Sequence, residues 1–221
     1  MGAAILFFAG LAVVAAWWLS KHRLTAKPWL EVGPAGEFPG TGVSSVPTAK
    51  IGLGVFLAVV GSLFALLLSA YFMRMQLADW RPVLKPTVLW INTGVLVLSS
   101  AALVWSQDAA ARRDAAGART GLLVAGVAAL AFLGGQLLAW QQLSEAGYFL
   151  TSNPANAFFY LITAVHGLHL LGGLVALGRT VLKAGQGSDL KQLYLSVELC
   201  AMYWHFLLLL WLVLFSLLFL T

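Results

Sequence analysis

Charged residues are scarce in this sequence, and their scarcity excludes a water-soluble domain. Only 10% of the 221 residues are Asp, Glu, Lys or Arg, whereas 61% are hydrophobic. A soluble domain carries about 25% charged residues. A chain with so few of them lacks the side chains that cover a water-facing surface, so we interpret it as an integral membrane protein.

Cysteine is almost absent as well. The single cysteine, Cys200, lies in an apolar run, so the sequence holds neither a disulfide framework nor a cysteine-based metal site. The formal net charge of +5 does not indicate nucleic-acid binding, because the thirteen Lys and Arg residues fall in short segments between apolar stretches. Membrane topology requires basic residues at those places.

Six apolar stretches are long enough to cross a bilayer, which takes about 20 residues. We predict an all-α bundle forming a single membrane domain over residues 1–221, with a long Pro- and Gly-rich connection at 20–50. The predicted spans are 3–19, 51–73, 86–107, 120–142, 156–182 and 192–220. Small residues on the fourth span predict close helix packing; they are Gly121, Ala125, Ala128, Gly134 and Gly135.

The distribution of basic residues predicts the orientation of these spans. The first, third and fifth connections carry four, three and three Lys or Arg, and the second and fourth carry three and none. With both termini on the periplasmic side, ten basic residues therefore face the cytoplasm and three face outward. The positive-inside rule favours this arrangement over its reverse.

Ionisable residues inside the spans are few, and they are the best indicators of function. His166 and His169 share a face of the fifth span, and Glu198 and His205 share a face of the sixth. Counted at 1.5 Å per residue, the three histidines lie at about the same depth, with Glu198 roughly two turns closer to the cytoplasm. We expect Glu198 to hydrogen-bond a histidine of the fifth span, and His169 is the best placed.

These residues leave three roles open. His205 with His166 or His169 has the geometry for haem b ligation, but no Arg lies in the membrane interior to accompany a haem. A proton or ion pathway requires titratable groups that reach both sides of the membrane, and the sequence offers them on one side. Hydrogen bonding between the last two spans needs nothing further, so the spacing favours it.

Three stretches resemble subunit III of the haem–copper respiratory oxidases. "FFYLITAVHGLHLLGG", which contains Thr163, His166 and His169, is similar to the penultimate helix of that family. "ELCAMYWHFLLLLW" is similar to the last helix and contains Glu198 and the run Tyr203, Trp204 and His205. "NTGVLVLSS", which begins at Asn92, resembles an earlier helix. The three stretches occur in the family's order.

The resemblance implies a non-catalytic subunit III of a bacterial terminal oxidase that reduces O₂ to water in aerobic respiration. Such a subunit carries no cofactor or metal, packs against subunits I and II, and binds phospholipid; haem and copper belong to the partner subunits. It implies a multi-pass protein of the cytoplasmic membrane, fed electrons by cytochrome c or quinol, of which we expect cytochrome c. Candidates for lipid headgroup contacts are Arg74, Arg179 and Lys183.

The sequence also departs from the family pattern. Acidic residues that are usual in the family are replaced by Val60 or Gly61 on the second span, Ala139 on the fourth and Leu208 on the sixth. Two other interpretations remain alongside subunit III of a cytochrome c oxidase. One is the related accessory subunit of a nitric oxide reductase, and the other is a haem b membrane cytochrome that uses His166 and His205.

Overall fold

Five long helices account for nearly all of the described chain. The computed structural model describes residues 47–82, 86–185 and 190–220, and these residues form no strand. The helices are α2 (Thr48–Met75), α3 (Val88–Ala111), α4 (Ala115–Glu145), α5 (Pro154–Gly185) and α6 (Leu190–Leu220). All five are long and apolar enough to cross a membrane.

The five helices coincide in position with the last five predicted spans. Each observed boundary lies within five residues of its predicted position. At eight of the ten ends the helix continues past the predicted apolar stretch, because a helix can extend beyond the bilayer into water, where polar residues are favourable. The predicted span at 3–19 and nearly all of the connection at 20–50 lie outside the described residues.

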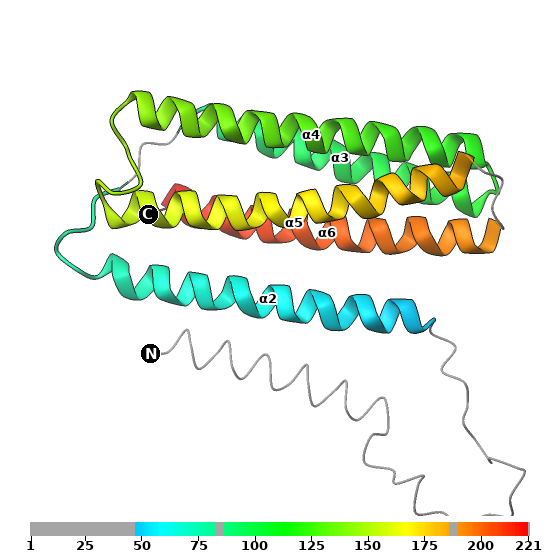
Figure 1. Ribbon diagram of the computed structural model, residues 1–221, viewed down its shortest axis with the longest axis horizontal. Helices are drawn as coiled ribbons and strands as arrows, with labels where there is room; N and C mark the ends of the chain where they lie inside the picture. The colour runs from blue at the N-terminus through cyan, green and yellow to red at the C-terminus, as the bar shows by residue number, and fades with distance from the viewer. Residues whose placement is uncertain (1–46, 83–85, 186–189, 221) are drawn as a thin grey trace, which may run out of the picture. The chain divides into compact units, whose positions relative to one another are not determined.

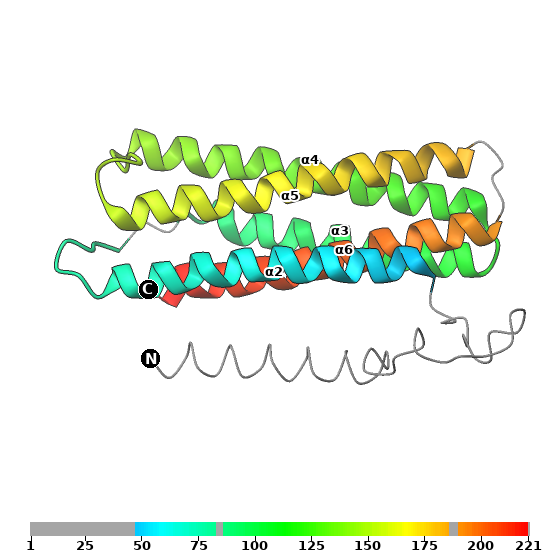
Figure 2. The same cartoon turned by 60° about the horizontal axis from the view of Figure 1, so that its bottom comes forward.

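Helices α3 to α6 form a four-helix bundle, and α2 runs along the side made by α5 and α6 (Figures 1 and 2). Large side chains from three of the helices fill the bundle interior, among them Trp204 and Trp211 of α6, Phe132 of α4 and Phe159 of α5. The helix surfaces that face outward carry exposed apolar side chains on every element. Apolar side chains both inside the bundle and on its outer surface are expected of a protein that is surrounded by lipid.

The turn between α3 and α4 holds these two helices close together. Arg113 adopts a φ of 63°, which reverses the chain direction after α3. The side chain of Asp114 then caps α4 by accepting a hydrogen bond from the Gly117 amide at 2.9 Å. Further along α4, a Cβ on Gly121 would collide with the backbone and side chain of Ser106, so this glycine permits the close approach of the helices.

The predicted packing role of the small residues on α4 is confirmed only in part. Gly121 and Ala125 are buried against α3, and a Cβ on Gly135 would overlap the carboxamide of Asn92. Gly134 instead lies exposed, with nothing within 4 Å of an added Cβ. The prediction was wrong for Gly134 because consecutive residues on a helix point about 100° apart, so Gly134 and Gly135 cannot both face α3.

Side-chain hydrogen bonds join the helices within the membrane. Trp204 of α6 donates its Nε1–H to Ser99 Oγ of α3 at 3.0 Å, and Ser99 Oγ donates to the Ala125 carbonyl of α4 at 2.8 Å. Trp211 of α6 donates in the same way to Thr93 Oγ1 of α3 at 2.9 Å. The Ser99 hydroxyl therefore connects three helices at one point.

We predict that Ser99→Ala destabilises the bundle, because it removes two interhelical hydrogen bonds and leaves the buried Trp204 indole unpaired. The expected loss is about 1–3 kcal/mol of unfolding free energy, measured by thermal or denaturant unfolding in detergent. Ser62→Ala is the matched control, since that hydroxyl donates to Ala58 O of its own helix. Equal stability of the two variants would contradict the prediction.

Candidate functional site

His166 joins α5 to α6 in the buried centre of the bundle. Its side chain is fully buried, and its Nε2–H donates to the Leu207 carbonyl of α6 at 3.2 Å. The rings of Phe132 from α4 and Trp211 from α6 pack against the imidazole at centroid distances of 5.7 and 5.1 Å. The prediction that this histidine holds α5 to its neighbours is therefore supported by a specific bond.

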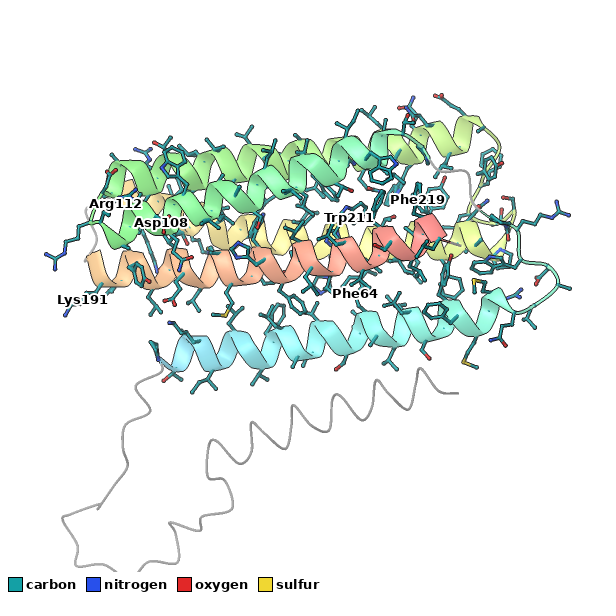
Figure 3. All side chains as sticks on the ribbon, turned by 180° about the vertical axis from the view of Figure 1, so that it is seen from behind. Phe64, Asp108, Arg112, Lys191, Trp211 and Phe219 are labelled. Carbon is teal, nitrogen blue, oxygen red and sulfur yellow. The ribbon has the colours of Figure 1, made fainter. Side chains whose placement is uncertain are left out.

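His169 makes its interhelical connection through its backbone. Its Nδ1–H donates to the Val165 carbonyl of the same helix at 2.7 Å. The carbonyl of His169 accepts a hydrogen bond from the Tyr203 hydroxyl of α6 at 2.8 Å. Phe64 of α2 points toward α5 and α6 (Figure 3), and its ring centroid lies 5.7 Å from that of His169.

Glu198 pairs with α2, so the expected bond to His169 was wrong. Its Oε1 accepts a hydrogen bond from Lys50 Nζ at 2.5 Å, in an ion pair whose side chains are 26% (Lys50) and 19% (Glu198) exposed. The expectation assigned Lys50 to the connection before the second span, whereas α2 begins at Thr48 and carries Lys50 in its first turn. A cation was therefore available at the depth of Glu198.

His205 does not share the buried environment of His166. Its side chain is exposed on α6, whereas that of His166 is fully buried and donates to Leu207. Two axial haem ligands have to face a common space on neighbouring helices, and these two side chains do not. The residues therefore do not fit the haem b interpretation. Within the described residues no cluster of three His, Cys, Asp or Glu is arranged to hold a metal ion.

The remaining motif residues serve helix packing. The Asn92 carboxamide of α3 donates to the Phe132 carbonyl of α4 at 3.3 Å. Thr163 Oγ1 of α5 accepts from Trp140 Nε1 of α4 at 3.1 Å and donates to its own helix. Sequence reasoning missed the partners on the other helices, although the polar side chains Thr93 and Ser99 in the "NTGVLVLSS" stretch are a signal that pointed to them.

The three basic residues proposed for lipid headgroups lie at opposite ends of the bundle. Arg74, at the end of α2, donates two hydrogen bonds to the Asp79 carboxylate at 2.6 and 2.5 Å. These bonds lower the pKa of Asp79 below its usual value. Arg179 and Lys183 lie exposed in the last two turns of α5, at the other end.

An apolar groove of about 290 Å³ lies between α2, α5 and α6. It is lined by Leu53, Phe56, Gly172, Gly173, Ala176, Leu199, Cys200, Tyr203 and Trp204. Leu53 is one turn from Lys50, and Leu199 follows Glu198, so the groove begins beside the ion pair. One exposed face of α5 leads from the groove to the end of the helix. At helical spacing it carries Gly172, Ala176, Arg179 and Lys183.

The fold and these contacts define a multi-pass membrane protein whose intramembrane polar groups join helices to one another. The family profile for cytochrome c oxidase subunit III matches residues 29–221. The chain belongs to this family, and it is thus a subunit III of a haem–copper oxidase.

Relatives in three bacteria are similar over most of their length. Cytochrome c oxidase subunit 3 of Thermostichus vulcanus is 32% identical over 174 residues, which cover 76% of this chain and 85% of the relative. The Synechocystis protein of that name is 30% identical, covering 76% of this chain and 74% of the relative. A probable cytochrome c oxidase subunit 3 of Mycobacterium tuberculosis is 30% identical, covering 76% and 85%.

We predict that Lys50 and Glu198 stabilise the chain as a pair. Lys50→Gln and Glu198→Gln should each lower the unfolding free energy, and their combination should cost less than the two losses added together, because the second substitution has no partner left to disrupt. Thermal unfolding of the four proteins in detergent measures this coupling. His169→Phe combined with Glu198→Gln is the control and should be additive. Additivity of the Lys50 pair would contradict the ion pair.

Proposed function

We propose that this chain is the cofactor-free, non-catalytic subunit III that stabilises the catalytic subunit of its oxidase. The observation that supports this role most strongly is the bond from His166 to the Leu207 carbonyl, because it uses the most deeply buried of the described histidines for helix packing. The polar residues that resemble the family motif are used in the same way. Haem and copper would then belong to subunit I, with subunit II as the second protein partner.

The complex is proposed to take electrons from cytochrome c and reduce O₂ to water in aerobic respiration. The names of the bacterial relatives support cytochrome c oxidase over the accessory subunit of a nitric oxide reductase. Electron transfer and proton translocation would take place in the partner subunits. The contribution of this chain would be to keep their arrangement intact during turnover.

The orientation proposed from the sequence has both termini on the periplasmic side of a bacterial cytoplasmic membrane. Among the described residues, the end of the bundle formed by the starts of α2, α4 and α6 carries seven basic residues: Lys50, Arg112, Arg113, Arg119, Arg179, Lys183 and Lys191. Arg112 and Lys191 can be seen at this end in Figure 3. The other end carries Arg74 and Arg81. This asymmetry supports a cytoplasmic location for the basic end.

A phospholipid is proposed to occupy the groove between α2, α5 and α6. The groove is lined mainly by apolar side chains, as an acyl chain requires. Arg179 and Lys183 lie on the same α5 face one and two turns beyond Ala176, within reach of a headgroup phosphate. Arg74 is a weaker candidate than Arg179 or Lys183, because it lies at the opposite end of the bundle and pairs with Asp79.

We predict that Gly172→Leu displaces this lipid. Nothing lies within 4 Å of an added Cβ at Gly172, so a leucine there fills the groove without a collision. The variant oxidase should retain less phospholipid after delipidating washes, measured by mass spectrometry. Gly134→Leu is the matched control, because that glycine is equally open but lies on α4. Equal lipid retention in both variants would exclude the groove as the binding site.

We predict that an oxidase prepared without this chain keeps its haem spectra but loses activity progressively during turnover. The spectra should persist because the chain is proposed to hold no redox centre. The activity should decay because the catalytic subunit loses a packing partner. Oxygen uptake followed over many turnovers, beside the complete complex, measures the decay. Undiminished activity over the same number of turnovers would refute a stabilising role.

A further inference from the structure

An exposed histidine lies at the midpoint of α6. His205 is fifteen residues from each end of the helix Leu190–Leu220, and its side chain is exposed. At 1.5 Å per residue it is about 22 Å from either end, in the centre of a bilayer. Within the described residues its imidazole makes no hydrogen bond, and a ring that faces hydrocarbon without partners for its N–H donor and its ring-nitrogen acceptor is costly.

The surroundings of His205 distinguish this face of α6 from the other exposed faces. The exposed residues of α6 at helical spacing from His205 form one stripe with it; they are Met202, Leu209, Leu212 and Ser216. Among the described residues, the other exposed Asp, Arg and Lys side chains of the spans lie near helix ends, where they can reach water. The middle of the bundle therefore exposes a basic side chain at one place.

The stripe runs along the outer side of α6. Figure 3 shows the bundle from the side on which α6 runs between α3 and α2. The neighbouring residues Tyr203 and Trp204 are buried in bonds to α5 and α3, so α6 cannot rotate to bury His205 without breaking both. The imidazole has to be covered from outside the five helices.

We propose that the α6 stripe centred on His205 is a docking surface for a membrane-spanning helix of another subunit of the oxidase. That helix would present a hydrogen-bond acceptor, either a carboxylate, a hydroxyl or a free backbone carbonyl, to the His205 imidazole. Met202, Leu209 and Leu212 would supply the apolar contact on both sides of this bond. The inference rests on the proposed function as a packing subunit and adds the surface through which packing takes place.

The sign of the effect of His205→Leu tests this proposal. A leucine is favourable against lipid, whereas at the proposed interface it removes the donor and leaves the acceptor of the partner unpaired. Less of the chain should then co-purify with the catalytic subunit after detergent washing, by about fivefold, as the loss of one intramembrane hydrogen bond implies. His205→Gln, which keeps an N–H donor, should be retained more nearly like the natural chain. Full retention of His205→Leu would overturn the proposal.

A crosslinking experiment identifies the occupant without altering His205. A photoreactive amino acid replaces Leu209 in the stripe or, as the control, Leu168, which is exposed on α5. In membranes that contain the whole oxidase, the group at 209 should crosslink to another oxidase subunit more strongly than the group at 168. Crosslinks from 209 to lipid, to a quinone or to this chain itself, in the same or a second copy, with none to another subunit, would overturn the docking surface. This result would leave the turnover test of the proposed function unaffected.

Discussion

The structure depends on the requirement that polar groups inside a membrane find partners within protein, because hydrocarbon offers none. The Ser99 hydroxyl meets this requirement for three helices at once, since it accepts from Trp204 of α6 and donates to the Ala125 carbonyl of α4. His166 adds the connection from α5 to α6. These bonds fix the rotation of each helix about its own axis, and the apolar side chains then pack around that arrangement.

The side chains of the run Tyr203, Trp204 and His205 point in three different directions from α6. Consecutive residues on a helix point about 100° apart. Tyr203 therefore reaches the His169 carbonyl of α5, Trp204 reaches α3, and His205 faces outward. Two members of the motif anchor α6 inside the bundle, and their bonds hold the third on the outer surface. The orientation of His205 is thus a consequence of the bonds that its neighbours make.

Helix α2 is attached by a different kind of contact. Its first turn is held by the ion pair between Lys50 and Glu198, and its middle by the ring of Phe64 against the histidines of α5. Between these two attachments Phe56 of α2 packs against Tyr203 of α6, and the apolar groove lies beside this contact. A charged pair 26% and 19% exposed suits the region near a membrane surface, where water reduces the cost of desolvating both groups.

The sequence by itself determined the class of protein and the positions of the five described helices, because long apolar stretches have few stable alternatives to membrane-spanning helices. It also identified the polar residues that matter, including His166, Thr163 and Asn92, since each is costly in hydrocarbon. Only the tertiary structure decided their partners. Glu198 pairs with Lys50 on a helix 148 residues earlier in the chain, and not with His169 on the preceding helix. Periodicity specifies which residues share a helix face, but the neighbour of that face depends on how all the helices rotate and pack together.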